Sequence, residues 1–392
     1  MSQAHKGSRL LIKDAIYAVP FESTHFNFNE DAIGIRQGDL VEPLGNNIYS
    51  MREKEGRYGG AVLIEDGTTN LNVVENGIVR SGSGNITTVT ETDGPFSGWF
   101  KTTINTVNPI GDYVAGIASY TITKESTVTY YSMSLDFYST NKDIVPVVSG
   151  GTEIPELRLV EVGGNRWEIN SIPAPAGTGR LACNYYLKNL GGAKDGDVIY
   201  FRNKQAEKNT ISTSYIPKGT TREQGKITYP TEIFNPKSFT ITMWVKWKKL
   251  NDSYNPLFEC NYGSANRFLW MLDTMPNGKK LTYFSNGPLG VSEIRSSHIP
   301  ELGKWYMYTI TYDGNKMFQY VDGVKVSETS WVPASDPLGA NVTIGSGKYG
   351  VSNALIDELT ILPNSVSSDE VSSWFIAGTP FYNPYDYRGY AY

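Results

Sequence analysis

The sequence predicts an all-β protein of antiparallel sheets, packed as sandwiches or barrels, with one short helix near the C-terminal end. Three observations favour this class. The 392 residues include 39 Gly, 20 Pro and 26 Tyr while only 19% are charged, which is typical of many turns and aromatic surfaces. Apolar residues alternate with polar ones in several runs, as in half-buried strands. Gly-containing pairs separate these runs, as in β-hairpins.

The clearest single element is a predicted three-stranded meander over residues 303–326. Residues 305–312 carry aromatic, β-branched and long apolar side chains, which suit a pleated, half-buried surface. Asp313-Gly314 follows, and its Gly supplies the positive φ angle of a tight turn. Residues 317–321 run back, and Asp322-Gly323 turns the chain into a third strand.

Another strand is predicted over residues 239–247. Thr240, Thr242 and Lys246 alternate with apolar residues and share a face with Trp244. The opposite face carries Phe239, Ile241, Met243, Val245 and Trp247.

The middle of the chain shows the same period of two. Residues 156–162 and 166–169 form a predicted hairpin through Gly163-Gly164. Such runs, separated by Gly-rich turns, favour a sandwich or barrel. Two predicted strands each have one apolar face, formed by Tyr131, Met133, Leu135 and Phe137 in one and by Leu181, Cys183, Tyr185 and Leu187 in the other.

One helix is predicted, over residues 368–377. Ser367 and Glu370 match a capping box, in which each side chain caps the other residue's backbone N–H. Val371, Trp374 and Phe375 are spaced so that one face of the helix packs on a sheet.

Composition and charge argue against several classes of function. The net charge is −5 without a basic run, which disfavours a nucleic-acid-binding surface. No apolar run approaches the length of a membrane span. The first residues lack an apolar core, so we expect no secretory signal and synthesis in a cytosol. Cys183 and Cys260 are then expected to be reduced, buried thiols in different domains.

The meander carries a family resemblance. The pattern G-K-W-Y-x-Y-x-x-T-Y-D-G followed by Y-V-D-G-x-x-V resembles the central hairpins of a laminin-G-like (concanavalin A-like) jelly-roll sandwich. The strand over residues 239–247 extends the resemblance, and residues 354–362 are similar to the late IDE strand of that family. The resemblance implies the fold, which hosts lectins, adhesion modules, hydrolases and viral structural domains.

Other segments also resemble known families. Residues 58–71, with the pattern Y-G-x-A-V-x-I-E-x-G-T-T-N-L, are similar to a recurring segment of bacteriophage tail and baseplate proteins. Residues 196–216 resemble the closing strands of carbohydrate-binding-module-like jelly rolls in phage proteins. Residues 11–22 resemble the opening strand of laminin-G-like domains, with Glu22 where an Asp usually stands.

Together these patterns predict two antiparallel β-sandwich domains, one of them discontinuous. We expect a laminin-G-like sandwich of residues 13–66 and 221–379, with a carbohydrate-binding-module-like jelly roll of residues 67–220 inserted in it. Insertion at a loop is easy when the ends of the inserted domain lie close together. Residues 1–12 form an arm and residues 380–392 a Tyr-rich tail, and we expect both to contact other subunits of a homo-oligomer, most simply a trimer.

The sequence offers little for catalysis. His5, His25 and His298 are scattered, without the spacing of a metal pair. The adjacent Asp357 and Glu358 are predicted to point to opposite faces of a strand, so they cannot form the carboxylate pair of a sandwich glycosidase. We therefore expect no enzymatic activity.

Two kinds of binding site remain. Asp357 matches the Asp of the family's IDE strand, and the resemblance implies Ca²⁺ at the sandwich rim; the alternative is a carboxylate that hydrogen-bonds loop backbone. Exposed aromatic side chains could stack on saccharide rings, although Trp residues in such sandwiches also occupy cores and interfaces. The candidates near predicted loops are Trp99, Tyr262, Trp270, Trp331 and Tyr349.

The expected function is that of a structural phage protein, in a tail, baseplate or fibre, which assembles with other virion proteins and binds a host cell-surface glycan. We expect it in the virion after synthesis in the host cytoplasm, with neither a nucleic-acid partner nor membrane insertion. The alternatives are a polysaccharide-degrading depolymerase, and a bacterial surface adhesin or head decoration protein. A depolymerase would need carboxylates facing one cleft, and an adhesin would need an export signal or a wall anchor.

Overall fold

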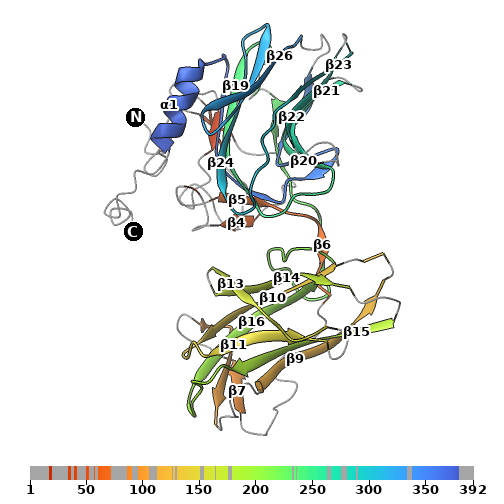
Figure 1. Ribbon diagram of the computed structural model, residues 1–392, viewed down its shortest axis with the longest axis vertical. Helices are drawn as coiled ribbons and strands as arrows, with labels where there is room; N and C mark the ends of the chain where they lie inside the picture. Colours follow the sequence, from red (N-terminus) through yellow and green to blue (C-terminus); the bar gives the residue numbers. More distant parts are fainter. Residues whose placement is uncertain are drawn as a thin grey trace. The chain divides into compact units, whose positions relative to one another are not determined.

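The computed structural model describes most of the chain, in two compact units (Figure 1). One unit comprises Met1–Asp66 and Gln224–Tyr392, and the other comprises Gly67–Glu223. The described residues are 17–19, 34–36, 39–41, 50–52, 57, 61–71, 86–90, 96–105, 113–125, 127–128, 130–150, 154–163, 165–174, 179–231, 234, 236–262, 266–274, 280–287, 290–332 and 338–378. They form antiparallel strands and one helix, α1 (Ser368–Gly378), which confirms the predicted all-β class.

The first unit contains a ten-stranded sheet that joins both ends of the chain. β5 (Ala61–Ile64) pairs with β4 (Ser50–Arg52) and with β30, so the N-terminal strands complete a sheet made mainly by later ones. The rest of the sheet follows the order β26 (Val324–Ser330), β25 (Lys316–Val321), β24 (Trp305–Tyr312), β19 (Phe239–Trp247), β30 (Ala354–Leu362), β1 (Tyr17–Val19), β2 (Gly34–Arg36) and β3 (Asp39–Val41).

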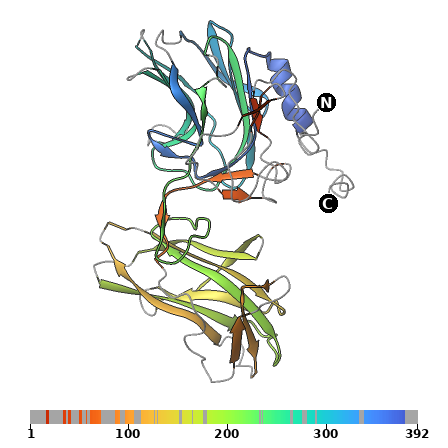
Figure 2. The ribbon, with the colours of Figure 1, turned by 180° about the vertical axis from the view of Figure 1, so that it is seen from behind.

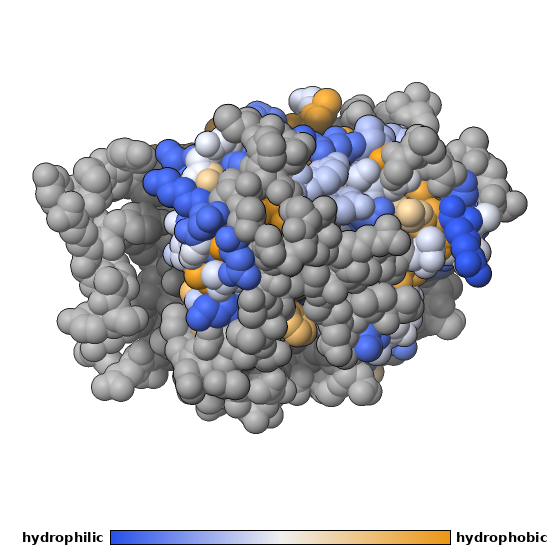
Figure 3. Space-filling view, turned by 90° about the horizontal axis from the view of Figure 1, so that it is seen from below, coloured by the Kyte–Doolittle hydropathy of each residue, from blue (hydrophilic) through white to orange (hydrophobic). Residues whose placement is uncertain are grey.

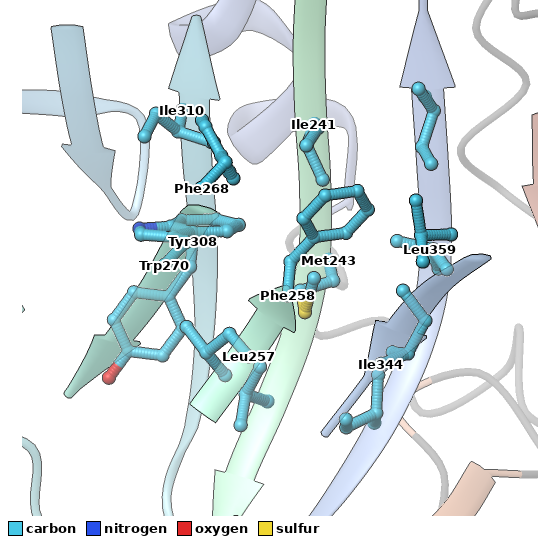
Figure 4. Close-up of a cluster of buried hydrophobic side chains, with 14 of the residues drawn as sticks. Ile241, Met243, Leu257, Phe258, Phe268, Trp270, Tyr308, Ile310, Ile344 and Leu359 are labelled. Atoms are coloured by element: carbon cyan, nitrogen blue, oxygen red, sulfur yellow. The ribbon is translucent and has the colours of Figure 1, made fainter. Parts of the chain in front are cut away.

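A six-stranded sheet faces it and closes the sandwich. Its order is β18 (Ile227–Pro230), β27 (Leu338–Ile344), β20 (Tyr254–Tyr262), β21 (Asn266–Asp273), β22 (Lys280–Gly287) and β23 (Gly290–Arg295). Side chains of β19 and β24, among them Met243 and Ile310, meet Phe268 and Trp270 of β21 between the sheets (Figure 4). The predicted sharing of one face by five apolar residues of β19 is confirmed, because all five belong to this core.

Helix α1 covers the other face of the ten-stranded sheet (Figures 1 and 2). Trp244, on the outward face of β19, packs there with Val371 of α1, and its ring stacks on Phe375 at 5.8 Å between centroids. The predicted capping box is present: the Ser367 N–H donates to Glu370 Oε2 at 2.9 Å, and the Glu370 N–H donates to Ser367 Oγ at 3.2 Å.

The predicted meander is confirmed as β24, β25 and β26. The Asp313 carboxylate accepts the backbone N–H groups of Asn315 and Lys316, at 2.8 and 2.7 Å, and so holds the first turn. In the second turn Asp322 and Gly323 both have positive φ angles, of 50° and 78°. Asp322 Oδ1 also accepts the Met307 N–H at 2.8 Å, which ties this turn to the start of β24.

The second unit is also a two-sheet sandwich. Its larger sheet has the order β13 (Val160–Gly163), β14 (Arg166–Pro173), β10 (Tyr130–Ser139), β16 (Val198–Glu207), β8 (Phe100–Ile104) and β7 (Ile86–Thr90). The smaller sheet has the order β12 (Leu157–Arg158), β11 (Ile144–Ser149), β15 (Gly179–Asn189) and β9 (Tyr113–Lys124). Both predicted apolar faces, on β10 and β15, lie in the core between these sheets.

The chain enters and leaves the second unit through paired strands. β6 (Thr68–Thr69) pairs with β17 (Thr221–Arg222), and the hydroxyls of Thr69 and Thr221 lie 2.7 Å apart. The amide of Asn70 extends this contact by donating to the carbonyl of Ile216 at 2.9 Å.

The predicted hairpin around Gly163-Gly164 is only partly correct. β13 pairs with β14, as expected, but β12 pairs with β11 of the other sheet. Between them Leu159 is fully buried and its N–H donates to the Pro146 carbonyl at 3.1 Å, so the chain crosses from one sheet to the other at this residue.

Both cysteines are free and buried, one in each unit, as predicted. Burial raises the pKa of both thiols to about 12. The described part of the chain contains no helix long and apolar enough to span a membrane.

The two Asp-Gly turns of the meander provide a matched test of how α1 docks. Gly314 and Gly323 both have positive φ angles, so Ala at either site strains the backbone by about 1–2 kcal/mol. A Cβ at Gly323 would also lie 2.9 Å from Phe375 Cβ, whereas at Gly314 the nearest atom is the Lys237 carbonyl oxygen at 3.6 Å. We expect Gly323→Ala to lower the free energy of unfolding by about 1–3 kcal/mol more than Gly314→Ala, measured by chemical denaturation. Equal losses would contradict a tightly docked helix.

Candidate functional site

Two of the predicted aromatic candidates lie in the core of the first unit. Trp270 is a strand residue of β21, and Trp331 packs edge-on against Tyr312 at 4.6 Å. Both side chains are buried, so the expectation that they expose their rings is wrong, although Trp331 does lie just beyond the end of β26. Their apolar surface fills the space between the sheets. Tyr262 ends β20, and its side chain lies outside the described part of the structure.

Tyr349 is exposed, in a small hairpin of β28 (Ser346–Gly347) and β29 (Gly350–Val351). Its ring contacts that of Tyr254 at 4.8 Å. The hairpin is held to β20, because the Lys348 N–H donates to Glu259 Oε2 at 2.8 Å. This Tyr pair is a small aromatic surface on the first unit.

Trp99 lies in a larger aromatic group on the outer face of the larger sheet of the second unit. Its ring is buried beneath the guanidinium of Arg202, whose Cζ lies 4.5 Å from the ring centroid. Phe96 meets it edge-on at 5.3 Å. Trp99 therefore supports this surface from below instead of presenting its own ring to solvent.

We call the surface formed by the rings of Phe96, Tyr138 and Tyr200, with Trp99 beneath it, the aromatic face. Phe96 stacks on Tyr200 at 4.1 Å with 14° between the ring planes, and it lies 4.8 Å from Tyr138. Tyr138 and Tyr200 are direct partners across β10 and β16, and Tyr138 remains 39% exposed. The three rings thus form one continuous aromatic surface on a hydrogen-bonded sheet.

A charged network borders the aromatic face. The Asp136 carboxylate accepts from Arg166 Nη1 at 3.0 Å, from Arg202 Nε at 3.3 Å and from Asn203 Nδ2 at 2.8 Å. A β-bulge in β16 places Asn203 opposite β10, with a φ angle of 50°. Three strands are therefore held together by one carboxylate.

Such a surface combines flat apolar rings with fixed donors and acceptors. Aromatic rings bind apolar faces of a ligand, and the amide, guanidinium and phenol groups hydrogen-bond its polar groups. The aromatic face therefore suits a ligand that has both C–H faces and hydroxyl groups. Seen from below, the coloured residues of the molecule are mostly hydrophilic, with small, separate hydrophobic areas among them (Figure 3).

Sequence reasoning found Trp99 but missed Phe96, Tyr138, Tyr200 and Arg202. A local signal existed for Tyr138, because it follows the inward Phe137 and must therefore point outward. The grouping depends on the pairing of β10 with β16 and on the turn before β8, which no local pattern contains.

Asp357 lies in the ten-stranded sheet, fully buried. Its Oδ2 accepts the Arg57 N–H and its Oδ1 accepts the Glu358 N–H, both at 2.8 Å. These bonds match the alternative of a carboxylate that binds loop backbone. Among the residues that the structure describes, no three metal-ligating side chains form a cluster.

The prediction that Asp357 and Glu358 alternate regularly between the two faces of a strand is wrong. A β-bulge interrupts β30 here: Thr242 pairs with Thr360 and Trp244 with Asp357, so Glu358 and Leu359 together face Met243. Glu358 has a φ angle of 51°, and its side chain is also buried. Simple alternation therefore does not describe these two residues.

Of the three histidines, only His298 lies within the described ranges. Its Nε2 lies 3.0 Å from the Tyr308 hydroxyl, and its ring meets that of Tyr306 edge-on at 4.9 Å. Burial, with a smaller contribution from the nearby Lys304, lowers the pKa of His298 to about 4. The imidazole is therefore neutral at pH 7 and belongs to a buried aromatic group.

Replacing Asp357 separates its two predicted roles. Asp357→Ala leaves two backbone N–H groups without this acceptor, and we expect a loss of about 1–3 kcal/mol for each. The control is Asp252→Ala, at an exposed position in the same unit. Thermal unfolding would be measured with millimolar Ca²⁺ and with a chelator, and we expect the wild-type midpoint to be the same in both. A midpoint raised by Ca²⁺ in the wild type alone would show that Asp357 is a calcium ligand.

One known family matches a large part of the first unit. Residues 220–372 match the family described as the concanavalin A-like lectin/glucanases superfamily. A search of curated proteins finds no match.

Solved structures with similar regions include three of different kinds. Domain 4 of AbnA, a GH43 extracellular arabinanase from Geobacillus stearothermophilus in complex with arabinotriose, is 18% identical with a TM-score of 0.35, over 42% of this chain and 82% of that one. The botulinum neurotoxin serotype D binding domain is 12% identical with a TM-score of 0.31, over 39% and 40%. A heptameric SAP-like pentraxin from Limulus polyphemus is 17% identical with a TM-score of 0.29, over 35% and 68%.

These likenesses carry no argument about function. The chain spans about two fifths of the length of the neurotoxin binding-domain chains that it matches. The family match supports the laminin-G-like resemblance drawn from the meander and from the IDE strand. Residues 220–372, nearly all of them in the first unit, are thus similar to the concanavalin A-like lectin/glucanases superfamily.

Proposed function

We propose that this protein binds a glycan, without catalysis, on the aromatic face of its second unit. The observation that carries the proposal is the contact of Phe96 with both Tyr138 and Tyr200 beside the Asp136 network. It places aromatic rings and hydrogen-bonding groups on one sheet face.

A sugar has both apolar and polar surfaces. A pyranose ring has C–H faces that pack on aromatic rings, and its hydroxyls both donate and accept hydrogen bonds. Pairs of aromatic rings contribute about 0.5–1.5 kcal/mol beyond the area they bury, and we expect a pyranose face packed on a ring to contribute a similar amount. Because the rings are stacked on one another and held by paired strands, little side-chain freedom is lost on binding.

The first unit supplies a second, smaller candidate. The half-buried Tyr254 and the exposed Tyr349 form an aromatic pair at a hairpin that Glu259 holds in place. The concanavalin A-like fold alone does not choose between binding and other activities, since it hosts many functions. We therefore assign the main site to the aromatic face.

The biological setting proposed is a bacteriophage particle. Its support is the resemblance of residues 58–71 to tail and baseplate proteins, a stretch that contains the buried strand β5. In this setting the protein is a homotrimeric tail, baseplate or fibre component, and it carries the glycan site to a host surface. A depolymerase and a cell-surface adhesin remain the alternatives.

Tyr138→Ala and Phe96→Ala test the glycan site. Each removes one ring of the aromatic face, and we expect binding to weaken about 5- to 30-fold, equivalent to about 1–2 kcal/mol. The matched control is Tyr130→Ala, since Tyr130 is 40% exposed on the same strand, outside the aromatic face. A glycan array identifies the ligand and calorimetry measures its affinity.

Two results would overturn this proposal. Binding that survives both substitutions would move the site elsewhere. New reducing ends, released when the wild-type protein is incubated with the bound glycan, would favour the depolymerase.

The particle setting has a separate test. We expect a band of 43.5 kDa, identified by mass spectrometry, in purified phage particles from a lysate in which this protein is made. A protein found free as a monomer, and absent from washed particles, would exclude a virion component.

A further inference from the structure

We propose that the aromatic face selects saccharides that carry a carboxylate, and that Arg202 binds this group. The inference rests on the proposed glycan site and adds its substrate class. It comes from the unequal positions of the two arginines that share Asp136.

Arg166 is a structural arginine. Its side chain is 12% exposed, and it donates to Asp136 Oδ1 at 3.0 Å, to the Asn203 carbonyl at 2.9 Å and to Ser134 Oγ at 2.5 Å. Both of its terminal nitrogens are therefore engaged. Its position explains how Asp136 and the bulge at Asn203 are fixed.

Arg202 is bound at one nitrogen only. Its side chain is 41% exposed, and Nε donates to Asp136 Oδ2 at 3.3 Å. Within the described ranges of the chain, its two terminal nitrogens make no hydrogen bond. The guanidinium lies on the Trp99 ring, so its plane is fixed while its outer edge stays open.

The local charge favours an anion. Two guanidinium groups share one carboxylate, which leaves one positive charge in excess. Lys101 lies beside Tyr200, with Nζ 5.9 Å from the ring centroid. Two further described acidic residues lie on these strands. Glu168 lies beyond β10, opposite Ser134, on the side away from Arg202. Glu207 is buried at the end of β16, where its carboxylate accepts from the backbone N–H and the hydroxyl of Thr213.

The register sets the distance between the ring and the charge. Asp136 pairs with Arg202, and Tyr138 pairs with Tyr200, two residues further along both strands. Two residues rise about 6.6 Å along a strand, so an acidic group on a sugar stacked at Tyr138 lies within reach of Arg202. A guanidinium fork matches the two oxygens of a carboxylate, and such bonds are stronger than those between neutral groups.

The test uses saccharides in matched pairs. Uronate- and sialate-containing oligosaccharides are arrayed beside their carboxyl-reduced forms, which keep the same rings but carry an alcohol in place of the acid; sulfated oligosaccharides form a third group. The variants are Arg202→Ala, Arg202→Lys and the control Arg180→Ala, an exposed arginine on β15 of the other sheet. Asp136 keeps Arg166 and Asn203 in the Arg202 variants, so the fold is expected to persist, and thermal unfolding checks this.

The expected result is at least a tenfold preference of the wild type for a carboxylated saccharide over its reduced form. Arg202→Ala removes the preference but still binds the reduced form, Arg202→Lys keeps part of it, and Arg180→Ala resembles the wild type. Added salt weakens the binding of the acid more than that of the alcohol.

Four results would overturn the inference. Equal binding of the carboxylated saccharide and its reduced form would overturn it. A preference confined to sulfated saccharides would also overturn it. Both results would leave the proposed glycan site intact. An Arg202→Ala variant that lost both forms equally would make Arg202 a support of the aromatic rings. Absence of binding to every saccharide would overturn the glycan site as well.

Discussion

Strand pairing around β30 is the constraint on which the first unit depends. β30 pairs with β19 on one edge and with β1 and β5 on the other, so it joins segments from both ends of the chain. Every residue of β30 is buried, and several belong to the core between the sheets. Such long-range pairing brings a loop-closure cost, which is offset only when the whole sandwich buries its apolar faces. The meander of β24 to β26 pairs strands that are neighbours in the sequence, and it forms one edge of the ten-stranded sheet.

The regular elements could be predicted from the sequence, because their signals are local. The alternation in β10, β15 and β19 assigned their buried faces, and the Ser367–Glu370 capping box gave the start of α1. The failures occur where tertiary structure overrides a local pattern. The bulge at Glu358 breaks alternation, and the crossing at Leu159 divides one predicted strand between two sheets. Trp270 and Trp331 were expected to expose their rings, but both are buried in the core between the sheets. The aromatic face could not be predicted, since its rings come from a turn and from two strands whose register only the fold defines.

The aromatic face illustrates how a polar network can make a surface rigid. Asp136, on β10, is hydrogen-bonded to side chains of β14 and β16, and the rings of the aromatic face lie beside this network. Charge-assisted hydrogen bonds are shorter and stronger than neutral ones, and Asp136 lies where solvent screens them only in part. Arg202 belongs to both parts of the surface, because it touches the carboxylate and the Trp99 ring. Its geometry therefore links the apolar and the charged halves of the site.

The paired strands β6 and β17 have a consequence for how such proteins change in evolution. Because Thr69 and Thr221 are partners, the ends of the second unit leave it side by side. A domain with adjacent ends can be exchanged for another by recombination while the flanking fold keeps its connections. The DNA that encodes Gly67–Glu223 thus corresponds to one exchangeable domain. A lineage that exchanged it would acquire a new surface in a single event and retain the sheet that both ends of the chain build together.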